Sequence, residues 1–187
     1  MKIFNSLKSE KEDFIPLKEE KISIYVCGMT VYDDCHIGHA RTFLSFDSIV
    51  RYLRFRGFKV NYIRNITDVD DKILKRSEEL NIEPSELTQK YIEEMDNDFE
   101  SLSMITPDLE PRATENIDSI INLISKLIEK GNAYVTDSDV FFDTASYLEY
   151  GKLSNRKIEE LISGSRVEVD PEKKNNNYKQ TLIVLVV

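Results

Sequence analysis

The sequence predicts an α/β protein organised around a parallel β-sheet. Residues 22–26 and 59–64 are short apolar segments typical of buried strands, and the segment 37–56 between them has the pattern of a helix. A strand–helix–strand unit of about 43 residues allows its two strands to pair in parallel, because the return path needs a crossover helix. Apolar residues make up 41% of the 187 residues, which supports a packed core.

The elements of this unit follow from the local residue pattern. Residues 1–21 are mixed and charged and contain Pro16, so we expect a short strand or an arm there. The helix predicted from about Ile37 to Arg56 has apolar residues near the helical period, and Gly57 suits its C-terminal cap. The positions expected to face the core are Ile37, Phe43, Leu44, Phe46, Ile49, Val50 and Leu53.

Further helices and a hairpin are predicted after the second strand. We expect helices at residues 71–80, after Pro84, and at 114–130, where Gly131 ends the last one. Residues 133–135 and 140–142 flank a polar turn, which indicates a β-hairpin, and residues 157–162 are expected to form a short helix. Apolar residues at helical spacing are Leu87, Tyr91, Ile92, Met95 and Phe99, then Ile117, Ile120, Ile121, Ile124, Leu127 and Ile128.

The net charge of −9 argues against this chain providing the main binding surface for a nucleic acid, because contacts from basic residues to phosphates dominate such binding. The local basic exception, interpreted as a solvated helix face, consists of Arg41, Arg51, Arg54, Arg56, Lys59 and Arg64. No run reaches the ~20 apolar residues of a membrane span, and the N-terminus lacks the apolar stretch of a secretory signal. We therefore expect a cytoplasmic protein without a membrane partner or a disulfide.

Candidate chemistry gathers at the junction between the first strand and the first helix. Both histidines and both cysteines of the chain fall between Cys27 and His39. The first turn of a helix attracts anions through its free N–H groups and its dipole. His36 and His39 are neighbours on one helical face, and Gly38 between them lets a phosphate approach the backbone. The sequence therefore predicts a triphosphate site without a Walker-type lysine loop.

The cysteines allow more than one interpretation. Cys27 ends the first strand, at the sheet edge where α/β proteins present ligands, so it is either a metal ligand or a buried thiol. A closed site of both cysteines and both histidines would need the unfamiliar spacing C-x₇-C-H-x₂-H, and we interpret Cys35 as a packing residue. The carboxylates before the second helix, Asp68, Asp70 and Asp71, read as capping charges more readily than as a magnesium site.

Four ordered blocks carry a resemblance to a known family. His36-Ile37-Gly38-His39 resembles the H-I-G-H signature of class I aminoacyl-tRNA synthetases. The longer run at residues 25–42 resembles the cysteinyl-tRNA synthetase family in particular, and so do residues 62–73, 111–115 and 150–154. The resemblance runs in order from about residue 3 to residue 174.

This resemblance implies a Rossmann-like parallel sheet, the first half of a class I synthetase catalytic domain, with a mostly helical insertion. The implied organisation is a first catalytic half with following helices at residues 1–110, the insertion at 111–175, and an aberrant tail at 176–187. The K-M-S-K-S loop of the family is absent from the sequence. After the run K-K-N-N-N the family pattern stops, so we expect a truncated or frame-shifted product that is inactive alone, with an unpaired, aggregation-prone tail.

The resemblance also implies roles for individual residues. The activity would be ATP-dependent conversion of cysteine to cysteinyl-adenylate, followed by transfer to tRNA(Cys), with magnesium accompanying ATP. His36 and His39 would be catalytic, ATP would contact Thr30, Tyr32, His36, Gly38 and His39, and the substrate cysteine would contact Gly28 and Thr67. Cys27 would be the first of four zinc ligands, and a zinc–thiolate bond would reject serine. The full-length protein is expected to be a monomer.

Two alternatives remain open at this point. The related ligase that joins cysteine to an amino-sugar inositol in mycothiol synthesis uses the same adenylation chemistry, although residues 34–42 resemble the synthetase more closely. The chain could also be a non-catalytic remnant that binds nucleotide without turnover. Cysteine-dependent ATP–pyrophosphate exchange distinguishes the remnant from the enzyme.

Overall fold

The computed structural model describes residues 1–136 and 139–155 and the backbone of residues 181–186. The chain forms two compact units, one of residues 15–117 and one of residues 1–14 together with residues 118–187. The predicted helix at 157–162 lies outside the described residues. The predicted boundary between residues 110 and 111 separates the first catalytic half from the insertion. The two compact units do not test this boundary, so it stays a prediction.

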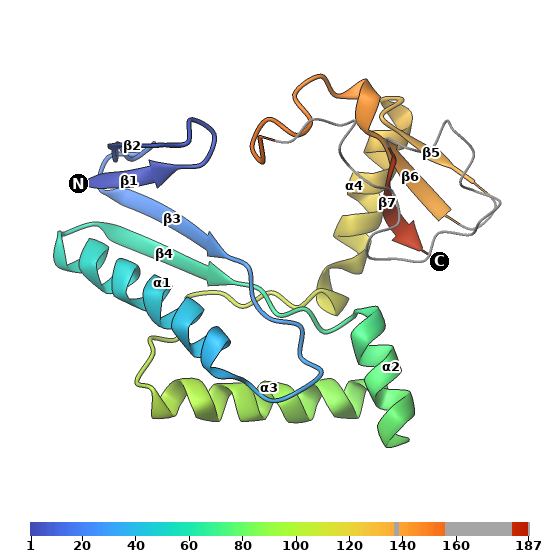
Figure 1. Ribbon diagram of the computed structural model, residues 1–187, viewed down its shortest axis with the longest axis horizontal. Coiled ribbons are helices and arrows are strands. Elements are labelled where there is room, and N and C mark those ends of the chain that lie inside the picture. The colour runs from blue at the N-terminus through green and yellow to red at the C-terminus, as the bar shows by residue number, and fades with distance from the viewer. Residues whose placement is uncertain (137–138, 156–180, 187) are drawn as a thin grey trace. The chain divides into compact units, whose positions relative to one another are not determined.

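The unit of residues 15–117 is built on the predicted strand–helix–strand. Strands β3 (Lys21–Val26) and β4 (Lys59–Arg64) pair in parallel, in register from Lys21 opposite Lys59 to Val26 opposite Arg64. Helix α1 (Ile37–Phe55) connects them and runs alongside the pair (Figure 1). The predicted βαβ unit is therefore confirmed, with each boundary within a residue or two of the expected one.

The sheet of this unit extends beyond the two predicted strands. The segment 108–113 lies along the other edge of β4: the Arg64 N–H donates to the Leu109 carbonyl at 3.1 Å, and the Ile66 N–H donates to the Pro111 carbonyl at 3.0 Å. The bridges Ile63–Leu109 and Ile66–Arg112 are parallel. Proline at 107 and 111 hides this strand from a pattern search, because proline is atypical of strands.

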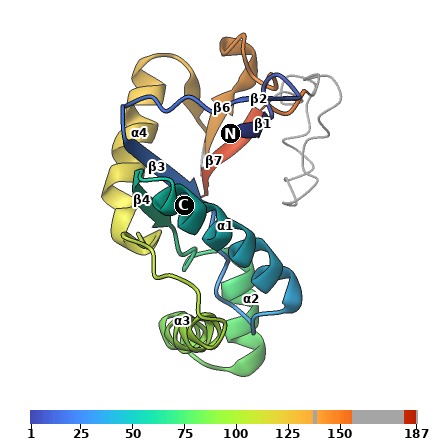
Figure 2. The ribbon, with the colours of Figure 1, turned by 90° about the vertical axis from the view of Figure 1, so that its left-hand side faces the viewer.

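The core of this unit lies where α1, β4 and α3 (Pro84–Ser101) meet; α3 is seen end-on in Figure 2, beside α2 (Asp71–Leu80). Its buried apolar residues include Phe43, Val50, Leu53, Tyr62, Leu87, Tyr91, Ile92, Met95 and Phe99. The five residues of α3 that recur at helical spacing are all buried. For α1 the prediction was partly wrong, because Ile37 is 86% exposed and Ile49 is 42% exposed.

Polar residues also enter the core of this unit. Asp47 is buried on α1, and its carboxylate accepts the Ile105 N–H at 2.8 Å and ion-pairs with Arg51 at 2.6 Å. Arg64 is also buried, with its guanidinium 5.3 Å from the Phe43 ring centroid and 4.6 Å from that of Phe99. A buried charge needs such partners, and an ion pair to Glu110 completes them.

The second unit is mainly antiparallel. Strands β1 (Lys2–Asn5) and β2 (Glu10–Asp13) form a hairpin where we expected a strand or an arm. The predicted hairpin is confirmed as β5 (Ala133–Val135) and β6 (Asp139–Asp143), followed by the short η2 helix Thr144–Ser146. The expectation of an unpaired tail was wrong, because β7 (Thr181–Val186) pairs antiparallel with β6.

Helix α4 (Ile117–Glu129), which follows the short η1 helix Thr114–Asn116, departs from its predicted packing. Of the residues expected to face inward, Ile124 is buried, whereas Ile117, Ile120 and Ile121 are 37–47% exposed. Periodicity identified the helix correctly, but it cannot show whether a neighbour covers the apolar face.

Candidate functional site

The chain leaves β3 at Val26 and enters α1 at Ile37, and a cavity of about 430 Å³ opens at this junction. Its lining consists of Cys27, Gly28, Met29, Thr30, Tyr32, Asp33, Asp34, His36, His39, Thr42, Phe43 and Lys72. Six of the eight predicted site residues are therefore brought together by the structure. The other two, Gly38 and Thr67, are placed close behind the lining by hydrogen bonds to residues of the cavity.

The two imidazoles form one stacked unit at the head of α1. Their ring centroids are 3.8 Å apart with an interplanar angle of 19°. His36 is the N-cap residue: its Nδ1 accepts the Gly38 N–H at 3.0 Å, while Nδ1 of His39 accepts the His36 N–H at 3.3 Å. This arrangement is a capping box made by two histidines, and it satisfies two of the free N–H groups of the helix start.

These hydrogen bonds determine where each ring carries its proton. A neutral imidazole has one donor and one acceptor nitrogen, and Nδ1 is the acceptor in both rings. The hydrogen bonds therefore assign the proton of both His36 and His39 to Nε2. Burial, and then the neighbouring His36, lower the pKa of His39 from its ordinary value, so this ring is neutral at pH 7. The pair thus offers two Nε2–H donors.

Gly38 lies directly against the first imidazole. A Cβ built on this residue would lie 2.8 Å from Cε1 and 2.9 Å from Nδ1 of His36, closer than side chains normally approach. The first turn of α1 also contains no acidic residue, so its positive end is not neutralised there. The absence of a side chain at residue 38 is therefore what allows the His36 ring to cap the helix.

Gly28 and Asn65 join the ends of the two parallel strands beneath the cavity. The Gly28 N–H donates to Oδ1 of Asn65 at 2.8 Å, and a Cβ on Gly28 would lie only 1.6 Å from the Asn65 carbonyl oxygen. Next along the chain, Thr30 and Thr67 form a parallel bridge. Asn65 Nδ2 also donates to the Thr67 hydroxyl at 3.2 Å, which orients that hydroxyl.

The two cysteines differ in their surroundings. Cys27 is exposed and lines the cavity, as expected for the end of a strand. The Cys35 thiol lies 3.5 Å from the sulfur of Met29, and burial, together with the nearby Asp98, raises the pKa of Cys35 to about 11. A thiol with this pKa stays protonated at neutral pH, which fits the predicted packing role.

Metal-ligating side chains do not converge around Cys27 in the described part of the chain. No group of three or more His, Cys, Asp or Glu residues there is arranged to hold a metal ion. Structural and catalytic zinc sites take at least three protein ligands, so the described residues hold no complete zinc site. Two of the acidic residues behave as predicted: Asp70 caps α2 by accepting the Lys72 N–H at 2.9 Å, and Asp71 lies in the first turn of α2.

Sequence reasoning missed Lys72 and the pair Asp33–Asp34 as cavity residues. Lys72 is the second residue of α2, and its ammonium nitrogen lies 5.4 Å from the centroid of the Tyr32 ring. Asp33 faces Arg76 of α2 at 3.8 Å. The signal available in the sequence was the D-D-K block after the second strand. We interpreted its carboxylates as capping charges and assigned no role to its lysine.

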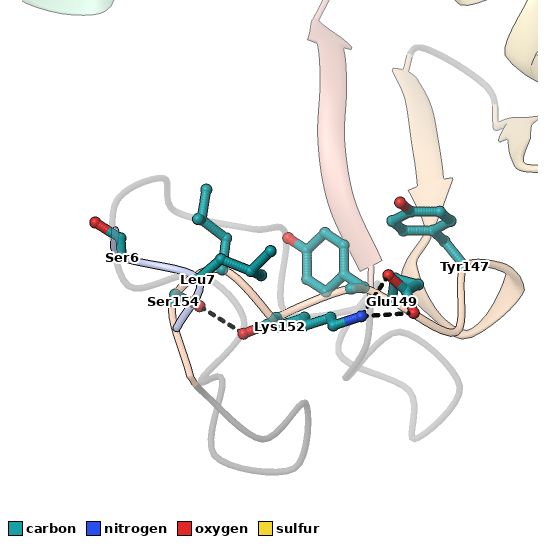
Figure 3. Close-up of a pocket in the computed structure, with 9 residues that line it drawn as sticks. Ser6, Leu7, Tyr147, Glu149, Lys152 and Ser154 are labelled. Carbon is teal, nitrogen blue, oxygen red and sulfur yellow. Dashed lines mark hydrogen bonds and ion pairs between the residues drawn. The ribbon is translucent and has the colours of Figure 1, made fainter. Parts of the chain in front are cut away.

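A cavity of about 730 Å³ in the other unit carries none of this chemistry (Figure 3). It is lined by Ser6, Leu7, Tyr147, Glu149, Tyr150, Gly151, Lys152, Leu153 and Ser154. Its lysine is already engaged, because Lys152 ion-pairs with Glu149 at 2.9 Å. With no histidine, no cysteine and a neutralised ion pair, this cavity offers hydrogen bonding but no reactive group, so the smaller cavity is the candidate site.

Comparison with known proteins identifies the family of the chain. A family model described as tRNA synthetases class I (C) catalytic domain matches residues 13–182. The chain belongs to the class I tRNA synthetase family. The matched range includes residues 36–39, which contain the stacked, helix-capping pair that lines the cavity.

Individual relatives narrow the similarity within the class I synthetases. The chain is 54% identical over 176 residues to a protein of Shewanella amazonensis, and 54% identical over 174 residues to one of Legionella pneumophila. Both relatives are named Cysteine--tRNA ligase. The alignments cover 94% and 92% of this chain and 38% of each relative, so the chain spans about 38% of the length of the curated relatives that it matches.

A solved synthetase supports the fold. The crystal structure of a ternary complex of Agrobacterium radiobacter K84 agnB2 LeuRS with tRNA and LeuAMS matches 72% of this chain and 18% of its own chain, with a TM-score of 0.56 and 22% identity. At this identity the likeness concerns the fold alone, and it confirms the predicted Rossmann-like α/β class. None of the helices in the described part of the chain has the length and apolarity that a membrane crossing requires.

Proposed function

We propose that this chain carries the ATP-phosphate and cysteine-binding half of a cysteine–tRNA ligase. The observation that supports this most strongly is the stacked pair His36 and His39, whose Nδ1 atoms are both occupied by backbone N–H groups at the head of α1. The cavity in front of the pair also holds the exposed thiol Cys27. Relatives at 54% identity that are named Cysteine--tRNA ligase add a second, independent support.

In this proposal the histidines act on the transition state of adenylation. The carboxylate oxygen of cysteine attacks the α-phosphorus of ATP, a carboxyl–phosphorus bond forms, and the bond to the pyrophosphate oxygen breaks. The substrate supplies its own nucleophile, so the protein needs donors for the charge that grows on the phosphate oxygens. The Nε2–H groups of His36 and His39 are such donors, and fixed donors of this kind contribute about 10²–10³-fold each in rate.

The remaining residues of the cavity would hold the two substrates. Thr30 and Tyr32 lie on the loop that approaches α1 and would contact ATP, and Gly38 would let its phosphates approach the helix start. Gly28 and the oriented hydroxyl of Thr67 would seat the substrate cysteine. Magnesium would enter with ATP, as is typical of phosphoryl chemistry.

Zinc is proposed for the complete ligase and not for this chain alone. Cys27 is positioned to give one thiolate, and zinc bound there would favour the sulfur of cysteine over the hydroxyl of serine. The described residues form no group of three or more ligands around Cys27. The acceptor, tRNA(Cys), would be gripped mainly by other parts of such a ligase, since the chain carries a net charge of −9. A ligase of this kind would work in the cytoplasm, where aminoacyl-tRNA is used.

Cysteine-dependent ATP–pyrophosphate exchange, measured together with ATP binding, tests this proposal. We expect this chain to bind ATP and to give no measurable exchange, because its sequence lacks K-M-S-K-S and its described residues hold no complete zinc site. Replacing either histidine by alanine should weaken ATP binding. Clear exchange from this chain would show that it is a self-sufficient enzyme, whereas a chain that binds no ATP would contradict the proposed site.

A further inference from the structure

Lys72 is a cavity residue whose ammonium group pairs with no carboxylate of the described residues. It stands in the first turn of α2, its backbone N–H is held by the Asp70 cap, and its ammonium lies over the Tyr32 ring at 5.4 Å. Among the residues that the structure describes, its ammonium group has no hydrogen-bond or ion-pair partner. A cation held against an aromatic face is positioned without being neutralised.

The position of Lys72 is also unfavourable for the helix that carries it. The start of a helix is its positive end, so a lysine in the first turn of α2 faces a dipole of the same sign. Residues that oppose a local preference in this way are expected where function requires them. The charge of this lysine does not stabilise its own helix. The same charge would stabilise an anion bound in the cavity.

The charges of the cavity lining show what such an anion would need. Asp33 and Asp34 contribute negative charge, and the His39 ring is neutral because its pKa is lowered. The triphosphate of ATP would add further negative charge. In the described lining of this cavity, Lys72 is the side chain with a permanent positive charge, and a lysine ammonium is a flexible point charge suited to phosphate.

We propose that Lys72 binds the polyphosphate of the nucleotide, as a ligand opposite the two imidazoles. This inference rests on the proposed function, because it assigns a further residue to the same ATP site. The imidazoles would donate neutral hydrogen bonds from the head of α1, and Lys72 would supply net charge from the head of α2. The Tyr32 ring would hold the ammonium near the phosphates and away from Asp33 and Asp34.

Calorimetric titration of this 187-residue chain with inorganic tripolyphosphate, ATP and adenosine tests the inference. The variants are Lys72→Met, which keeps the apolar stem, and Lys72→Arg, which keeps the charge. Lys75→Met is the matched control, because Lys75 is an exposed lysine of the same helix outside the cavity lining. Circular dichroism should show all variants folded, since removing a cation from a helix start does not weaken the helix.

We expect Lys72→Met to weaken the binding of tripolyphosphate and of ATP by about tenfold or more, the usual effect of losing a charge-assisted contact. Adenosine binding should not change, Lys72→Arg should restore most of the affinity, and Lys75→Met should change it by less than about twofold. If Lys72→Met binds tripolyphosphate like the wild type while His36→Ala binds ATP weakly, Lys72 is not a phosphate ligand and the proposed function stands. A wild-type chain that binds neither ATP nor tripolyphosphate overturns both.

Discussion

The substitution Gly28→Ala tests how closely the two parallel strand ends approach beneath the cavity. A methyl group at this position would lie 1.6 Å from the carbonyl oxygen of Asn65, where side-chain carbons do not come closer than 3.0 Å. The strand ends would therefore have to separate by at least about 1.4 Å, since both atoms in conflict are fixed close to the backbone. A shift of this size breaks hydrogen bonds that join the two segments.

Three hydrogen bonds are at risk in Gly28→Ala: Gly28 N–H to Asn65 at 2.8 Å, and two at 3.2 Å that link Val31 with Thr67 and Thr67 with Met29. At a net value near 1 kcal/mol each, we expect the free energy of unfolding to fall by about 2–4 kcal/mol. Urea unfolding followed by circular dichroism measures this loss. ATP binding should fall as well, because the same segment carries Cys27 and Thr30.

The matched control for Gly28→Ala is Gly57→Ala. Gly57 has φ +90° and nothing within 4 Å of an added Cβ, so alanine there meets backbone strain without a clash. We expect a cost of about 1–2 kcal/mol and no effect on ATP binding. If Gly28→Ala unfolds within about 0.5 kcal/mol of the wild type, the strand ends are not packed as described and the reasoning is refuted.

Three further predictions concern the imidazoles and the thiols. Gly38→Ala should displace the His36 ring, because Cε1 of that ring lies 2.8 Å from the added Cβ. We expect ATP binding to weaken severalfold and the free energy of unfolding to fall by less than about 1 kcal/mol. An ATP affinity equal to that of the wild type would contradict this. The folded protein lowers the pKa of His39 below 6.5, so the contribution of His39 to stability is full above pH 6.5 and is lost as the pH falls through the lowered pKa. His39→Gln should therefore reduce the acid dependence of the free energy of unfolding, measured with urea at pH 5–7. An unchanged dependence of this free energy on pH would refute the prediction. In alkylation followed by mass spectrometry, exposed Cys27 should react before Cys35, whose reactivity should rise up to a pH of about 11; the reverse order would contradict the assigned surroundings.

Local pattern predicted most of the unit of residues 15–117, because its elements have strong boundary signals. Helix α1 is bounded by His36 and Gly57, α2 follows the Asp70 cap, and α3 has Pro84 as its first residue. The parallel strands β3 and β4 followed from the length of the segment between them. These features depend on neighbours in sequence, and such features can be read from one chain.

Features that depend on distant partners were not predicted. The strand-like segment 108–113 is identified by hydrogen bonds to β4 and not by its own residues. Asp47 is buried because it accepts the Ile105 N–H, a contact made 58 residues away. The pairing of β7 with β6 joins segments separated by the long stretch between Asp143 and Thr181. Periodicity contains no information about such partners.

The candidate site shows the same division. The spacing of His36 and His39 predicted that they share a helical face, and the structure stacks them in one cavity with Cys27. The sequence could not show that each Nδ1 accepts a backbone N–H, which is the feature that directs both Nε2–H groups outward as donors. It also could not show that Lys72 reaches the same cavity, because that depends on where α2 begins relative to Tyr32.

The central claim is that two neutral, Nε2-protonated imidazoles at the head of α1 bind the phosphates of ATP. The chain has only two histidines, so nitrogen-15 NMR of the imidazole rings reports on this pair alone. At pH 7 we predict that both rings show a protonated Nε2 and an unprotonated Nδ1, and that adding magnesium and ATP shifts both Nε2 signals. Rings protonated at Nδ1, or Nε2 signals that do not move at saturating ATP, would contradict the account.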